Sequence, residues 1–153
     1  MYNFFLDAHS WLRWAVVIAG LLAVGRAIAG AAGGRSWSRT DERAGFWFVT
    51  LLDLQMVLGL VLYFVLSPIT RTALQDFGAA MKSSGLRFWG VEHLFGMIVG
   101  VVLVHLGRAR TRKLSDSPAR HRVAAVSYTL GLLAILASIP WPGMPNGRPL
   151  IRF

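Results

Sequence analysis

The stretch LRFWGVEHLFGMIVGVVLVHLGR, residues 86–108, decides the fold of this chain. It has the length of one membrane-crossing helix, because about 20 apolar residues span ~30 Å of hydrocarbon. It carries two histidines, His93 and His105, one toward each end. A ring nitrogen without a partner is costly in hydrocarbon, so histidines in such a helix indicate a functional site. The other histidines, His9 and His121, are their candidate partners.

Three more segments have the same apolar character. The sequence predicts spans over residues 4–30, 44–66, 86–108 and 120–139, and we expect the first to be retained rather than cleaved. Proline at 68 and 140 ends two of them. Residues 69–85 have room for a short interfacial helix, and the tail 143–153 is expected to be extended. Together these features predict one all-α transmembrane domain, residues 1–153, folded as an integral membrane four-helix up-and-down bundle.

Composition excludes several classes of protein. The 153 residues are 55% hydrophobic and contain no cysteine, which excludes disulfides, thiolate metal sites and covalently attached c-type haem. The net charge of +9 would suggest nucleic acid in a soluble protein. Here the basic residues flank apolar segments, so membrane topology and anionic lipid headgroups account for them, and we expect no nucleic-acid partner.

The basic residues are distributed unequally between the two sets of span ends. Because loops rich in Lys and Arg stay in the cytoplasm, the richer side is expected to be cytoplasmic and both termini to lie outside. That side holds Arg26, Arg35, Arg39, Arg43, Arg108, Arg110, Arg112, Lys113, Arg120 and Arg122, against Arg13, Arg71, Lys82, Arg87, Arg148 and Arg152 on the other.

This topology sorts the histidines into two pairs. His9 and His93 lie at the outer ends of different spans, and His105 and His121 lie near the cytoplasmic ends. Two helices that each offer an imidazole at one depth form a typical cradle for haem b. The outer pair is therefore predicted to ligate one haem iron.

Neighbouring residues support the outer site. Arg13 follows His9 by one helical turn, so it can hold a haem propionate or pair with Glu92, and Arg87 is a second propionate candidate.

Glycines suggest room for a flat ring. Gly90 and Gly96 lie three residues on either side of His93, where missing side chains would let a macrocycle approach. Gly96 and Gly100 also form a GxxxG motif, which is typical of close helix packing and is the alternative interpretation.

The inner pair makes a weaker case. His105 follows His93 by twelve residues, which gives about 18 Å of rise but turns the side chains about 120° apart. His121 lies in a basic ARHR cluster. A second haem on His105 and His121 is the weaker expectation.

Other polar and soft side chains in the spans leave alternatives open. Asp53 lies within a span, and Arg26 and His105 are its available partners. It either makes a structural contact or has a function, as part of a proton route or as a contact to a quinone. Met97, one turn after His93, allows a His/Met site for haem or Cu(I), or is core filler.

Several motifs resemble those of a known family. They are HSWLRW at 9–14, QMVLGLVLYF at 55–64, MK followed by LRFWGVEH at 81–93, GRARTRK at 107–113 and SIPWP at 138–142. In their order and spacing the chain resembles a family of small four-span bacterial membrane proteins called cytochrome b. The resemblance implies electron transfer in the bacterial cytoplasmic (inner) membrane, with His9 and His93 as iron ligands.

The leading hypothesis is therefore a multi-pass b-type cytochrome with one haem b, or two. It would carry electrons between the quinone pool and a partner at the outer face, as an electron carrier rather than an enzyme. One alternative is a haem-free accessory subunit that stabilises a larger respiratory or photosynthetic membrane complex, with a homo-oligomer also open. Another is a metal- or quinone-handling protein that uses His93, Met97 and Asp53.

Overall fold

A computed structural model describes residues 1–152 and shows long helices joined by short connections. The first two are α1 (Tyr2–Gly33) and α2 (Arg39–Val61), and a π-helical turn, η1 (Leu62–Leu66), extends α2. Three short helices follow, α3 (Pro68–Gln75), α4 (Phe77–Lys82) and α5 (Ser84–Arg87). A second π-helical turn, η2 (Phe88–Glu92), leads into α6 (His93–Lys113), and α7 (Ser117–Ser138) completes the set.

The all-helical class is confirmed, since no strand occurs within residues 1–152. Four continuous helical segments are long and apolar enough to cross a membrane: Tyr2–Gly33, Arg39–Leu66, Ser84–Lys113 and Ser117–Ser138. Each contains nearly all of a span predicted from sequence and extends into the polar residues beside it. The loop before residue 86, expected to hold one short helix, contains α3, α4 and α5.

Local sequence signals explain where the helices begin and end. Ser38 and Asp41 form a capping box at the start of α2, where each side chain accepts a backbone N–H of the other residue. Ser67 caps α3 with Pro68 in its first turn, and Asp116 caps α7 with its carboxylate. Gly34 ends α1 with a φ of 61°, a left-handed conformation that favours glycine.

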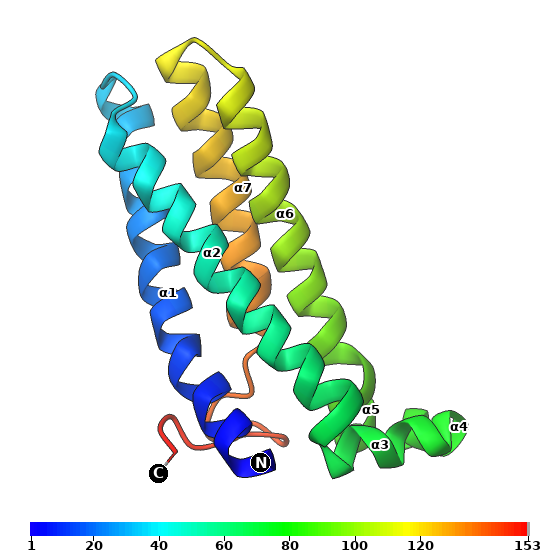
Figure 1. Cartoon of the computed structure of the whole chain (residues 1–153). Helices are drawn as coiled ribbons and strands as arrows, with labels where there is room; N and C mark the ends of the chain where they lie inside the picture. Colours follow the sequence, from blue (N-terminus) through cyan, green and yellow to red (C-terminus); the bar gives the residue numbers. More distant parts are fainter. Residues whose placement is uncertain (153) are drawn as a thin grey trace.

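The long helices alternate in direction and pack side by side (Figure 1). Helix α1 packs on α2 and α7, and α6 packs on the same two helices, so α1 and α6 lie diagonally opposite each other. We call the end that carries the connections 34–38 and 114–116 the loop end. The other end, which carries the N-terminus, α3 to α5 and the C-terminal tail, is the terminal end.

Two acidic residues tie all four long helices together at the loop end. Asp41 of α2 is buried and lies 2.9 Å from Arg26 of α1. Its neighbour Glu42 lies 2.8 Å from Arg108 of α6 and 3.0 Å from Arg120 of α7. Arg26 was expected to be available to Asp53, but Asp41 is its partner. Ion pairs, as well as packing, therefore hold the four long helices together at this end.

Helices α6 and α7 approach closely where glycines replace side chains. A Cβ built on Gly131 of α7 would lie 3.1 Å from the carbonyl oxygen of Gly100 on α6. One built on Gly100 would lie 2.6 Å from Cγ1 of Ile135. The GxxxG pattern is therefore part of a close helix contact, which small residues make possible.

The C-terminal tail folds back across the terminal end (Figure 1). It was expected to be extended, but residues 140–148 form turns in which the N–H of Arg148 donates to the carbonyl of Pro140 at 3.0 Å. Indole Nε1 of Trp14 donates to the carbonyl of Leu150 at 2.9 Å, and that of Trp11 donates to the carbonyl of Arg152 at 3.1 Å. These bonds hold the tail against α1.

Candidate functional site

A cavity of about 150 Å³ lies among the helices at the terminal end. Its walls are largely apolar, which is typical of sites that bind a cofactor or another small molecule. Polar groups reach it from α1, α2, α6 and the tail. The lining includes His9, Arg13, Leu52, Gln55, Met56, Gly59, Leu62, Tyr63, Ser67, Thr70, Trp89, His93, Met97, Val101, Ile135, Arg148 and Arg152.

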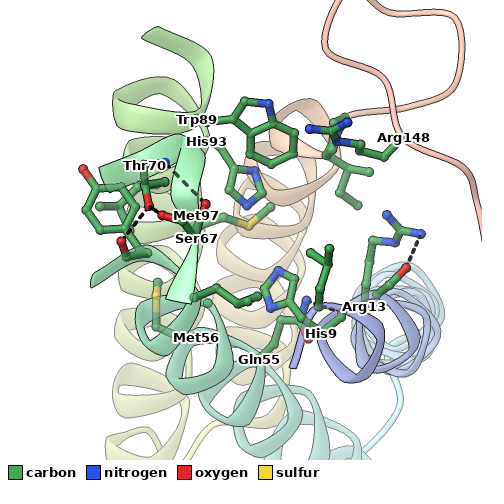
Figure 2. A pocket seen from close by; sticks show the side chains of 18 of the residues that line it. His9, Arg13, Gln55, Met56, Ser67, Thr70, Trp89, His93, Met97 and Arg148 are labelled. Carbon is green, nitrogen blue, oxygen red and sulfur yellow. Dashed lines mark hydrogen bonds between the residues drawn. The ribbon is translucent and has the colours of Figure 1, made fainter. Parts of the chain in front are cut away.

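The outer histidines meet across this cavity. His9 projects from α1 and His93 from the start of α6, and Figure 2 shows both rings in the same space. Their ring centroids lie 6.5 Å apart, with 72° between the ring planes. Since α1 and α6 are diagonal neighbours, the two imidazoles face each other through the interior of the helix assembly.

His93 is fixed by one hydrogen bond and two aromatic rings. Its Nδ1 lies 2.8 Å from the carbonyl oxygen of Ser138 on α7, and that oxygen only accepts. Nδ1 therefore carries the hydrogen, and Nε2 keeps a free lone pair. The rings of Phe88 and Trp89 lie 5.9 Å and 5.6 Å from the imidazole centroid. An imidazole whose other nitrogen donates to a carbonyl has the arrangement that metal ligands usually have.

His9 is held less completely. Its backbone carbonyl accepts a 2.9 Å hydrogen bond from Nε2 of Gln55 on α2, which fixes α1 against α2 at this depth. Its Nδ1 and the Oε1 of Gln55 are both buried without a hydrogen-bond partner. A Cβ on Gly59 would lie 3.2 Å from Cε1 of His9, so this glycine leaves the ring its space. Buried polar atoms without partners in a cavity wall are atoms that a ligand can satisfy.

Both π-helical turns border the cavity. Tyr63 of η1 donates its hydroxyl hydrogen to the carbonyl of Gly90 in η2, with an O–O distance of 2.6 Å. A π-helical turn widens a helix and leaves its carbonyls imperfectly paired, and such turns are frequent at functional sites. Here one such turn precedes His93 directly, so it sets the direction in which that ring points.

Three arginines gather at the mouth of the cavity, and Figure 2 shows two of them, Arg13 and Arg148, on one side of the histidines. Nη2 of Arg13 donates to the carbonyl of Leu150 at 2.6 Å, and Cζ of Arg148 lies 5.0 Å from the ring centroid of Trp89. Arg152 is the third. Within residues 1–152, none of the three forms a salt bridge with a carboxylate. The mouth is therefore a cationic surface suited to an anionic group.

Three residues predicted for this site lie elsewhere. Arg87 pairs with Glu92, with 2.6 Å between Nε and Oε1, and it is absent from the cavity wall. This pairing also means that Glu92 is not the partner of Arg13. The missing side chain of Gly90 faces Cβ of Ala73, and that of Gly96 faces the Ser138 side chain. Neither glycine opens space for a flat ring.

The inner histidines do not share a site. Nε2 of His105 lies 3.2 Å from Oδ1 of Asp53 on α2, as one of the expected alternatives had it. His121 is fully buried against α1, and a Cβ on Gly30 would overlap its ring. Its ring lies 4.9 Å from the ring of Trp37, and neither of its nitrogens has a hydrogen-bond partner. The ring of His105 thus faces α2, and the ring of His121 fills a notch in α1.

Two methionines complete the donor set of the cavity. Met97 follows His93 by one turn, and Met56 lines the wall from α2 (Figure 2). No group of three or more His, Asp or Glu side chains able to hold a metal ion occurs among the described residues. Any metal here would therefore rest on the two imidazoles, with the thioether sulfurs and neutral oxygen atoms such as Oε1 of Gln55 as further donors.

Sequence reasoning missed the contributions of α2 and of the tail. Gln55, Met56 and Gly59 of α2 lie within the motif QMVLGLVLYF, but no role in the site was predicted for any of them. A signal for the tail was present, since Arg148 and Arg152 are two basic residues close together in a segment rich in proline and glycine. The pattern did not give the contacts of the tail with α1, because these are made by backbone carbonyls of the tail.

Comparison with known proteins adds no assignment: no family model matches the chain, and no curated protein or solved structure is significantly similar to it.

Proposed function

We propose that this protein is an integral membrane b-type cytochrome, a four-helix up-and-down bundle in the bacterial cytoplasmic membrane with both termini outside. It carries single electrons between the quinone pool and a partner at the outer face. The observation that carries the proposal is the pair of imidazoles, His9 and His93, facing each other across an apolar cavity with arginines at its mouth.

The spacing of the two rings fits one shared iron. A metal–nitrogen bond of about 2.0–2.1 Å plus the distance of about 1.1 Å from that nitrogen to the ring centroid gives roughly 6.3 Å between opposed centroids. The measured separation is 6.5 Å. With Nδ1 of His93 bound to Ser138, the free Nε2 is the nitrogen available for ligation.

The charges at the mouth fit the two carboxylates of a haem. Arg13, Arg148 and Arg152 supply guanidinium donors, and carboxylates are the anions that such groups bind best. Arg13 was predicted for this role from sequence. Arg148 and Arg152 provide the guanidinium groups that were expected from Arg87. Arg87 itself is paired with Glu92.

The volume of the cavity is the hardest requirement for haem binding to meet. Pockets for small-molecule ligands usually measure about 300–1,000 Å³, and this cavity measures about 150 Å³. Binding a macrocycle therefore requires flexible side chains to turn outward. Met56 and Met97 are unbranched and adaptable, and the arginines of the tail sit on backbone turns rather than on a helix.

The chain's own residues would then do three things. His9 and His93 would both hold the iron through imidazole nitrogens, and ligation by two histidines favours electron transfer over bond chemistry. The apolar walls exclude water, and the arginines hold the carboxylates at the outer surface. Haem, when bound, supplies the one-electron chemistry.

The test is to purify the protein from haem-sufficient bacteria and to record reduced-minus-oxidised spectra with a pyridine haemochrome count. We expect one haem b per chain, with the six-coordinate spectrum lost in His9→Ala and in His93→Ala. Free imidazole added to either variant should restore it, which a purely structural role of the ring would not allow. Phe95→Ala is the matched control, because Phe95 lies two residues from His93 and is exposed.

A folded, colourless wild-type protein would refute the proposal. In that case, co-purification with a larger assembly would favour the haem-free accessory subunit. Circular dichroism and size-exclusion profiles of each variant separate loss of ligand from loss of fold.

The two methionines favour one second candidate, a Cu(I)-binding protein. Two imidazoles with two thioethers form a soft donor set suited to Cu(I), and a single ion needs much less space than a macrocycle. Elemental analysis discriminates the two: copper near one per chain, lost in Met97→Leu, with no haem absorption, would establish the second candidate.

A further inference from the structure

Asp53 lies midway along the apolar segment Arg39–Leu66, its partner His105 lies toward the loop end of the segment Ser84–Lys113, and the pair faces outward. Its side chains are 43% and 49% exposed, respectively. The residues next to it, Leu54 on α2 and Val102 on α6, are exposed and apolar. In the membrane proposed above, the pair would face the hydrocarbon on the cytoplasmic side of its middle, between Asp53 at the centre of α2 and His105 nearer the loop end of α6. Ionisable side chains there are rare and usually serve a function.

The pair holds one shared proton. Nδ1 of His105 lies 3.0 Å from the carbonyl oxygen of Val101, which only accepts, so Nδ1 carries a hydrogen. The other nitrogen, Nε2, lies 3.2 Å from Oδ1 of Asp53. Two bare lone pairs at that distance would repel, so a proton lies between them. The pair is therefore net neutral, whichever partner holds the proton, and this form is the one that hydrocarbon tolerates.

The second carboxylate oxygen of Asp53 has no hydrogen-bond or ion-pair contact among the described residues. An acceptor that faces hydrocarbon is satisfied only by a ligand that is soluble in lipid and carries a donor. A hydroquinone headgroup meets both conditions, because its hydroxyl groups donate while its ring and isoprenoid tail are apolar.

The pair also lies close to the cavity of His9 and His93, on the side of α2 and α6 that faces away from it. Leu52 precedes Asp53, Val101 accepts from His105, and both Leu52 and Val101 line the cavity of His9 and His93. A molecule bound at the pair would be separated from the cavity by side chains of α2 and α6.

We infer that Asp53 and His105 form a binding site for the headgroup of a lipid-soluble hydroquinone. A hydroquinone hydroxyl donates to the free oxygen of Asp53, and the chain of the ligand lies along the exposed side chains of α2 and α6. The inference names the lipid-soluble partner of the proposed electron carrier. Binding itself does not require haem, so the two proposals fail separately.

The test is direct binding of a short-chain alkyl hydroquinone to the detergent-solubilised full chain, measured by equilibrium dialysis and by saturation-transfer NMR. Loss of the hydrogen bond to Asp53 predicts a Kd up to about tenfold higher in Asp53→Leu, which removes both carboxylate oxygens. His105→Phe should weaken binding similarly, because it leaves the carboxylate without its proton partner. Leu130→Ala, an exposed apolar position on α7, is the control and should bind like wild type.

Equal binding by wild type and both pair variants would overturn the inference, as would the absence of binding by the wild type. A change of oligomeric state in Asp53→Leu, with hydroquinone binding retained, would also overturn it and would assign the pair to an interface between copies. If the wild type binds hydroquinone yet contains no haem, the site stands and the cytochrome proposal falls.

Discussion

The contact between α6 and α7 can be tested with two glycine-to-alanine substitutions of opposite expected sign. A methyl group on Gly131 would lie 2.5 Å from Cγ2 of Val104 and 3.1 Å from the carbonyl oxygen of Gly100. A methyl group on Gly25 of α1 would have no heavy atom within 4 Å. Both substitutions gain the same helix propensity, about 0.5–1 kcal/mol.

The difference between the two variants isolates the packing cost. Val104 can turn away, but the backbone of Gly100 yields only if α6 shifts, and such overpacking costs about 1–3 kcal/mol. Gly25→Ala should therefore be stabilised, and Gly131→Ala should be less stable than Gly25→Ala by about 1–3 kcal/mol. Unfolding by SDS titration in mixed micelles, followed by circular dichroism, measures both. Equal shifts in the two variants would show that the helices do not approach through these glycines.

Three further predictions follow from particular contacts. Arg148→Gln removes one positive charge from the cavity mouth, where a partly exposed charge contributes about 0.2–1 kcal/mol. Redox titration of the proposed haem should therefore give a midpoint potential lower by up to about 40 mV, and Arg71→Gln should leave that potential unchanged. Asp41→Asn loses the charge that pairs with Arg26 and should reduce the free energy of unfolding by about 1.5–3 kcal/mol in the same titration. His121 fills the notch at Gly30, so the haemochrome count should give one haem per chain, and a count of two would contradict this placement.

Much of the fold could be predicted because its signals are local. Apolar runs of bilayer length, the proline at 68 and the polar connections locate the long helices without any tertiary contact. That His9 and His93 lie at one end of the helices also follows from the alternation of the spans, but depth alone did not decide that their rings meet, since His105 and His121 match in depth and do not. The pairing of His105 with Asp53 was among the expected alternatives.

Rotation about the helix axis could not be predicted. Gly90 was placed on the face of His93 by α-helical spacing, but η2 is a π-helical turn that changes the register before His93. Gly90 therefore faces Ala73, and its carbonyl accepts from Tyr63. Gly96 turns toward α7, where the close approach of that helix brings Ser138 against it.

The folding of the tail was also beyond the sequence pattern. Its contacts with Trp11, Arg13 and Trp14 are made through the backbone carbonyls of Leu150 and Arg152, and every residue type carries such a carbonyl. Composition rich in proline and glycine predicts turns or extended chain alike.

The loop end and the terminal end of the helices each carry two histidines, but only those at the terminal end line a shared cavity. At the loop end, Asp41 and Glu42 bind arginines from the other three long helices, and this pairing leaves His121 packed in a notch of α1. At the terminal end, two π-helical turns widen α2 and the start of α6, and the space between His9 and His93 stays open. Matching depth does not by itself bring imidazoles together: His105 and His121 face different helices, whereas His9 and His93 face one cavity that leaves space between them.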